Sequence, residues 1–280
     1  MIWPRPAGSP APGAGALTVG VVAGASAVTS LAAASPLKIL VPRPRGPSVW
    51  AYLSSFGGGL VAGDETRVEV TLEPGARCFL GTQAATKVYR NPAGRPCGHR
   101  LDATLGAGSL LVLAPDPVQA FAGSRYHQRQ TFELGPGSGL VLVDWLSAGR
   151  TARGERWAFD HFESRNEVRC GAECRLLDAV RLDALGGPLT GAHRLGRFNC
   201  LAMLALFGEP LAAATTNLLA ETAARPVRRR EPLLVTASPL PHGVIVRLAG
   251  ESLAAVAAEI QRLLAFVPVL LHDDPWRRKW

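Results

Sequence analysis

The sequence predicts a mainly β protein with a pair of helices in its C-terminal part. Apolar and polar residues alternate with a period of two over much of the chain, and Gly/Pro turns separate these runs about every 8–12 residues. The 280 residues include 30 Gly and 22 Pro but only 6% aromatic residues, which favours many short elements. Strands and helices do not alternate, so a doubly wound nucleotide-binding fold is not expected.

The N-terminal part combines a Pro/Gly-rich start with a long uncharged run. Residues 1–16 are predicted to be a disordered lead, followed by a single domain over residues 17–280. Residues 17–34 consist mainly of Ala, Gly, Ser, Thr and Val, which favours two short strands. A signal peptide or membrane anchor is the alternative, but the run lacks a Leu-rich centre and is barely long enough to span a bilayer.

Extended runs separated by turns follow in a regular rhythm. Strands are predicted at 67–72 and 77–82, at 100–105 and 110–115, and at 126–134 and 140–146, with a Gly-containing turn within each of these three segments. Two further extended runs, 166–170 and 175–182, continue the pattern. The sequence contains no exact internal repeat, although such a rhythm allows strands to stack as a solenoid.

Helical signals come late in the chain. Residues 198–207 and 211–224 are rich in helix formers and are split by Gly208 and Pro210, which predicts helical structure near 198–224.

A second helix is predicted near 252–266. Ser252 can cap it, and apolar residues then recur at helical spacing until Pro268. Two strands, 233–238 and 243–248, are expected between the helical regions.

Charge and cysteine content restrict the partners. The net charge of +8 comes partly from the basic clusters 228–230 and 277–279, but no aromatic interleaving accompanies them, so a solvated face or an acidic protein partner is favoured over nucleic acid. Five Cys at wide spacing argue against a disulfide framework and favour a reducing cytoplasm. Cys170 and Cys174 form a C-x3-C pair, but no second pair completes a zinc site.

No catalytic set is evident, so an enzyme is not predicted. The Gly-rich run 56–64 lacks the Gly-Lys-Ser/Thr that a P-loop needs. The acidic run 160–167 suggests a carbohydrate-acting or carbohydrate-binding β-solenoid as the alternative function, since glycosidases use paired carboxylates. However, carboxylates close together on a strand point to alternate faces.

Several sequence blocks resemble the UreD/UreH family of urease accessory proteins, in the family's order and at its spacing, over roughly residues 17–270. They are SPLKIL (35–40), GGGLVAGD (57–64), PGARCFLGTQAATKVYRN (74–91), DWLSAGR (144–150), GERW (154–157) and GRFNCLAMLALFG (196–208). The combination of the Gly-rich block, the TQAATKVYR run and the Asp-Trp block is specific.

The resemblance implies a non-enzymatic role in the cytoplasm. Proteins of this family bind urease apoprotein and the UreF-like and UreG-like accessory proteins, the latter a GTPase, in an accessory complex that allows dimeric assembly. They help deliver nickel, which passes transiently, so no tightly bound cofactor is expected; neither nucleic acid nor membrane is an expected partner. The family fold resembles a β-helix-like stack with a helical pair and an internal tunnel.

A tunnel for nickel needs ligands that bind the ion weakly enough to release it. Oxygen ligands and water suit this role better than Cys or clustered His, which hold nickel tightly. The resemblance therefore implies a metal route through Asp64, Thr86, Asp144 and Asp178. The expected lining or supporting residues are Thr82, Gln83, Lys87, Tyr89 and Arg150. The alternative for the 82–92 stretch is a plain surface hairpin.

Overall fold

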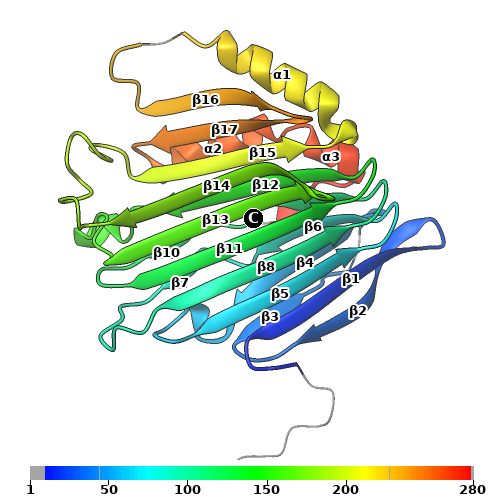
Figure 1. The fold of residues 1–280 in the computed structure, drawn as a ribbon, viewed down its shortest axis with the longest axis horizontal. Helices are drawn as coiled ribbons and strands as arrows, with labels where there is room; N and C mark the ends of the chain where they lie inside the picture. The colour runs from blue at the N-terminus through cyan, green and yellow to red at the C-terminus, as the bar shows by residue number, and fades with distance from the viewer. Residues whose placement is uncertain (1–9, 44, 227, 279–280) are drawn as a thin grey trace, which may run out of the picture.

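The strands form two stacked sheets in a computed structural model that describes residues 10–43, 45–226 and 228–278 (Figure 1). Sheet A contains, in spatial order, β14 (Glu173–Asp183), β13 (His161–Cys170), β11 (Arg125–Leu134), β8 (Cys97–Leu105), β5 (Glu65–Leu72), β1 (Ala14–Val22) and β2 (Ala25–Ala33). Sheet B contains β16 (Leu233–Leu240), β17 (Gly243–Gly250), β15 (Cys200–Phe207), β12 (Gly139–Ser147), β9 (Leu110–Leu113), β6 (Arg77–Thr82), β4 (Val49–Ser55) and β3 (Leu37–Leu40). Short β10 (Val118–Ala120) pairs with β12 and with β7 (Thr86–Val88).

From β4 to β13 the chain passes back and forth between the two sheets. Neighbouring strands run parallel in both: β5, β8, β11 and β13 in sheet A, and β4, β6, β9 and β12 in sheet B. Antiparallel pairs lie at the ends, such as β1 with β2 and β13 with β14. This alternation is a β-helix, and it confirms the predicted mainly β stack with helices in the C-terminal part.

The N-terminal run forms strands. β1 and β2 confirm the two strands predicted for residues 17–34. Strand β1 begins at Ala14, before the expected end of the lead, because Ala14 pairs in parallel with Arg67 of β5. Residues 1–9 of the predicted lead lie outside the described residues.

One predicted helix is a strand. Residues 198–207 were expected to be helical, but Cys200–Phe207 is β15, which lies between β12 and β17 in sheet B. A short apolar run buried on both faces has no periodicity that separates strand from helix. Sheet pairing on both sides decided the outcome here.

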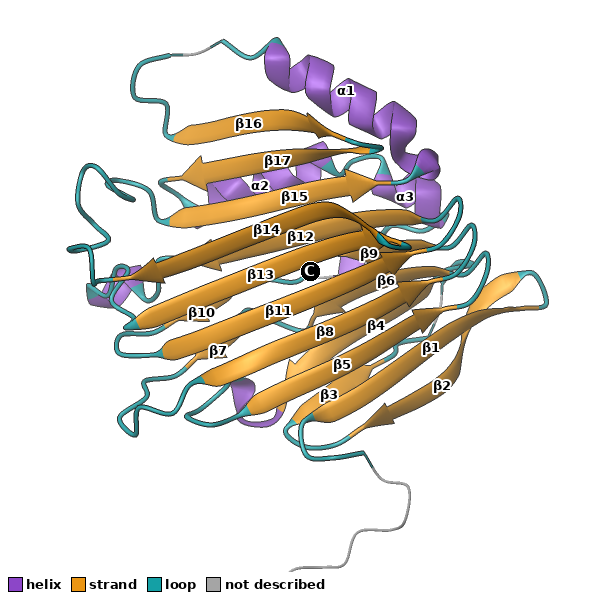
Figure 2. Cartoon of the chain, in the orientation of Figure 1, coloured by secondary structure: helices purple, strands orange, loops and turns teal. Residues whose placement is uncertain are grey.

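Three α-helices pack on the face of sheet B that points away from sheet A (Figure 2). They are α1 (Ala212–Ala223), α2 (Leu253–Leu263) and α3 (Val267–Leu271). Helices α1 and α2 lie within the ranges 211–224 and 252–266, and Ser252 accepts a hydrogen bond from the Ala255 N–H as the N-cap. Four 3-10 turns complete the described elements: Phe56–Gly58, Thr151–Arg153, Glu209–Leu211 and Pro275–Arg278.

Apolar side chains fill most of the space between the sheets. The buried cluster there combines residues of sheet A, such as Val70 and Phe132, with residues of sheet B, such as Leu80 and Leu142. Burial of this apolar area is the main force that holds the two sheets together. The exception is a polar region toward β14, described next.

Candidate functional site

Polar side chains interrupt the inner face of sheet A, the face that points toward sheet B. On β11, Gln128 and Gln130 lie between the buried aromatic residues Tyr126 and Phe132. On β13, Ser164 and Asn166 occupy the equivalent inward positions. Buried amides and hydroxyls cost free energy unless they are hydrogen-bonded, so these four side chains need partners.

Strand register supplies the first partners. In the parallel pairing of β11 with β13, Gln128 lies beside Ser164 and Gln130 beside Asn166. The Gln128 Nε2 donates to Ser164 Oγ at 3.2 Å, and the Gln130 Nε2 donates to Asn166 Oδ1 at 3.0 Å. The antiparallel pairing of β13 with β14 then places Asp178 directly opposite Asn166.

Asp144 of sheet B completes the network. Its carboxylate accepts hydrogen bonds from Gln128 Nε2 at 3.0 Å, Ser164 Oγ at 2.5 Å and Asn166 Nδ2 at 2.8 Å. Burial raises the pKa of Asp144 above its ordinary value, although the three donors oppose the rise, and the negative charge of Asp178 adds to it. The site is therefore a carboxylate held by neutral donors inside the stack.

Two cavities share the lining residues Asp144 and Trp145. The first cavity, about 210 Å³, reaches the surface near exposed Gln83 and Ala84. The second cavity, about 380 Å³, reaches the surface near Arg247. Each is large enough to hold several water molecules. Asp144 thus lines both cavities, one that opens near Gln83 and one that opens near Arg247.

An ion pair lies at the surface end of the second cavity. Arg247 of β17 donates to Asp178 of β14, so the pair joins the two sheets. The Asp178 residue is only 6% exposed, whereas the Arg247 side chain is 57% exposed. A buried carboxylate is therefore covered by a cationic side chain that water reaches.

Five of the residues named from the sequence lie along these cavities. Thr82, Gln83 and Thr86 line the first cavity, Asp178 lines the second, and Asp144 lines both. The Thr82 Oγ1 donates to Asp116 Oδ2 at 3.2 Å. The Gln83 Oε1 accepts from Ser54 Oγ at 2.7 Å. The first part of the 82–92 stretch thus faces a cavity and is not a plain surface hairpin.

Four other named residues line neither cavity. Asp64 closes a turn by accepting the Val61 N–H at 2.9 Å, Lys87 is exposed, and Tyr89 packs edge-on against Phe121 with ring centroids 5.4 Å apart. Arg150 lies 4.3 Å above the same Phe121 ring and pairs with Glu155. Local turns and alternating strand faces direct these four side chains away from both cavities.

Sequence reasoning missed the residues that surround Asp144. Gln128, Gln130, Ser164 and Asn166 occupy inward positions of strands that otherwise turn apolar residues inward, and this break in the period-two pattern was the available signal.

A histidine also faces the first cavity. His99 lies in contact with Thr66, with 2.8 Å between Thr66 Oγ1 and His99 Nδ1. Burial lowers the pKa of His99 from 6.5 to about 4, so the ring is neutral at pH 7. The lining therefore includes a ring nitrogen, whereas the resemblance implied a route of oxygen ligands.

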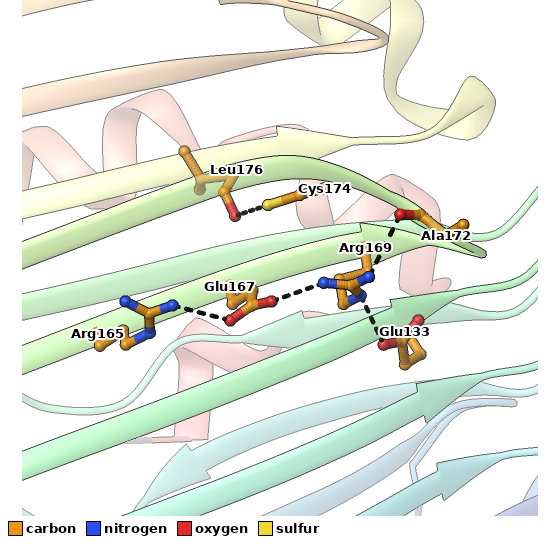
Figure 3. A network of polar contacts seen from close by, with 7 residues as sticks. All are labelled: Glu133, Arg165, Glu167, Arg169, Ala172, Cys174 and Leu176. Carbon is orange, nitrogen blue, oxygen red and sulfur yellow. Dashed lines mark hydrogen bonds and ion pairs between the residues drawn. The ribbon is translucent and has the colours of Figure 1, made fainter.

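The acidic run 160–167 lies mostly on the outer face of sheet A. Figure 3 shows Glu167 bound to Arg165 at 3.3 Å and Arg169 at 2.9 Å, with Arg169 also bound to Glu133 at 3.4 Å. The hydrogen bond from Arg169 lowers the pKa of Glu167. Glu167 is therefore held by two arginines on the outer face of sheet A.

The exposed Cys170 and Cys174 are free thiols at the turn between β13 and β14. Among the described residues, no group of three or more His, Cys, Asp or Glu side chains forms a metal cage. Nor does any helix within the described ranges have the length and apolarity needed to cross a bilayer.

The fold is a β-helix whose buried carboxylate, Asp144, lines two cavities. The model of the UreD urease accessory protein family matches residues 11–280. The chain is 47% identical to urease accessory protein UreD of Sorangium cellulosum, with 96% of this chain and 84% of the relative covered. The corresponding values for UreD of Anaeromyxobacter are 44%, 98% and 92%, and for urease accessory protein D of Arabidopsis thaliana 33%, 94% and 99%.

The chain therefore belongs to the UreD family of urease accessory proteins. Membership supports a role in urease maturation and implies a non-catalytic one.

Proposed function

We propose that this protein is a cytoplasmic scaffold and nickel conduit in urease maturation. It would stand between a UreF-like and UreG-like accessory complex, which allows dimeric assembly, and the urease apoprotein. Nickel is the cargo and would pass transiently. The relatives from Sorangium cellulosum and Anaeromyxobacter are named urease accessory proteins, which supports the maturation role.

The observation that carries the conduit is that the buried Asp144 lines both cavities. A passage for a divalent cation needs negative charge in its interior, and weak oxygen ligands that exchange quickly. Asp144 and Asp178 supply the charge, while Thr82, Gln83 and Thr86 supply neutral oxygens near one opening. Asp64, in a turn outside both cavities, is no longer part of the proposed route.

The donors around Asp144 also limit how tightly nickel would bind. Its two oxygens already accept three hydrogen bonds, so a passing cation would compete with Gln128, Ser164 and Asn166 for them. A carboxylate in such a network attracts a cation without forming a closed cage around it. Attraction with incomplete coordination is what transient passage requires.

The test is Asp144→Asn in a reconstituted urease activation system. We expect the complex with apoprotein to form at normal yield, while nickel per urease active site falls about tenfold or more, because the interior loses its central charge. Complex yield by co-purification and nickel by mass spectrometry are measured on the same sample.

Asp160→Ala is the matched control, since Asp160 is exposed and outside both cavities. It should leave nickel insertion unchanged. Normal nickel content with Asp144→Asn, or a decrease only in proportion to lost complex, would remove the conduit and leave a scaffold.

A further inference from the structure

The open end of the second cavity lies where sheet B extends beyond sheet A. Strand β14 is the edge strand of sheet A, whereas β17 and β16 continue sheet B past it (Figure 1). Arg247 projects from β17 into this step and reaches Asp178 on β14. The contact therefore bridges the gap between the sheets at the cavity's opening.

Acidic side chains outnumber basic ones along the two cavities. Among the described residues that line the two cavities, Asp116, Asp144 and Asp178 are acidic, and Arg247 is the only Lys or Arg. Asn166 donates to Asp144 and is the register partner of Asp178 in the pairing of β13 with β14. Arg247 thus supplies a single positive charge to a pair of acidic groups.

We propose that Arg247 is a displaceable plug, a tethered cation that occupies the carboxylate of Asp178 until a divalent cation takes its place. The inference rests on the proposed conduit and adds the residue that closes one end of it. An arginine at the opening of a pore is also an electrostatic barrier to cations.

The geometry allows the exchange. More than half of the Arg247 side chain is exposed, so its guanidinium can leave Asp178 and be hydrated without crossing apolar core. A divalent cation entering in its place matches the two carboxylates in charge, which Arg247 alone does not. Asp178 is nearly buried, so its carboxylate turns toward solvent less easily than the Arg247 guanidinium and remains at the second cavity.

Equilibrium dialysis of Ni²⁺ against the purified full-length chain tests the plug directly. Arg247→Met keeps much of the side chain's length and removes its charge, and we expect Ni²⁺ to bind about tenfold tighter, the effect of removing one competing charge beside a carboxylate. Arg247→Lys should give a smaller gain. Arg181→Met, which breaks an exposed ion pair with Asp183 on the same strand as Asp178, should give none.

The gain should vanish when Arg247→Met is combined with Asp178→Asn. Unchanged affinity in Arg247→Met and Arg247→Lys, or a gain that persists without the Asp178 charge, would overturn the plug. Circular dichroism of each variant checks that the fold is intact, and Arg247→Lys provides the comparison if Arg247→Met does not fold.

Failure of the plug and failure of the conduit give different results. Tighter Ni²⁺ binding in Arg247→Met, together with normal urease activation in Asp144→Asn, would support the plug at a cation site and remove the conduit. Unchanged binding in Arg247→Met, together with lost activation in Asp144→Asn, would keep the conduit and remove the plug.

Discussion

Polar side chains have different surroundings on the two faces of sheet A. Two neighbouring residues of β13 show the difference. Asn166 points inward, is fully buried and bonds Asp144 and Gln130. Glu167, the next residue, points outward and pairs with two arginines (Figure 3). On the inner face, neutral donors surround a carboxylate. On the outer face, oppositely charged side chains pair with one another.

This difference shows where interactions between charges are strongest in this fold. Ion pairs on the outer face are screened by water and contribute little each. Inside, the same Coulomb interaction is stronger because the surroundings are less polarisable. Two inner carboxylates with one covering arginine therefore create a stronger local field than the many charges outside.

The largest expected contrast comes from the adjacent pair on β13. Asn166→Leu should lower the free energy of unfolding by about 2–4 kcal/mol, because it removes a donor to Asp144 and leaves the buried Gln130 amide unpaired. Glu167→Gln, which weakens outward ion pairs, should lower it by less. Urea denaturation of both variants measures the two values.

Equal losses of unfolding free energy in these two variants would contradict the proposed difference between the two faces. A larger loss from Glu167→Gln would reverse it.

The next contrast concerns pH. Burial holds the pKa of His99 at about 4, below its ordinary 6.5, so the unfolded chain takes up a proton before the folded chain does. Stability present above pH 6.5 is therefore lost as the pH falls toward 4. At about 1.4 kcal/mol per pH unit, the upper limit of this contribution is about 3 kcal/mol.

Chemical denaturation of wild type and His99→Gln at several pH values between 4.5 and 7 checks this. The stability of wild type should fall more steeply with acid than that of the variant. Parallel curves for wild type and His99→Gln would show that His99 titrates as freely as in the unfolded chain.

The smallest expected effect belongs to a cavity hydroxyl. Thr86→Val keeps the side chain's shape but removes one neutral ligand from the first cavity, so nickel insertion should fall about two- to fivefold, as for the loss of one neutral hydrogen bond. Thr131→Val on the outer face of β11 is the control and should change nothing. A decrease as large as that of Asp144→Asn would place the limiting step at the opening and not at the central carboxylate.

Local patterning predicted much of the fold. Alternation and turn spacing identified the strands, although not that consecutive strands lie in opposite sheets. The small-residue run 17–34 formed two strands as predicted. Pattern alone failed for 198–207, since an apolar run buried on both faces is compatible with helix or strand until its neighbours are known. Sheet pairing with β12 and β17 is a long-range fact that no local window contains.

The sequence by itself determined that Thr82, Gln83, Thr86, Asp144 and Asp178 are polar residues in a β framework, and the family resemblance singled them out. Only the tertiary structure decided that these five meet cavities while Asp64, Lys87, Tyr89 and Arg150 do not. The physical reason is that strand period fixes which face a side chain takes, but which residues meet across the faces depends on register and sheet stacking. Asp144 thus acquires its donors from β11 and β13, and Asp178 acquires Arg247 from 69 residues away in the chain.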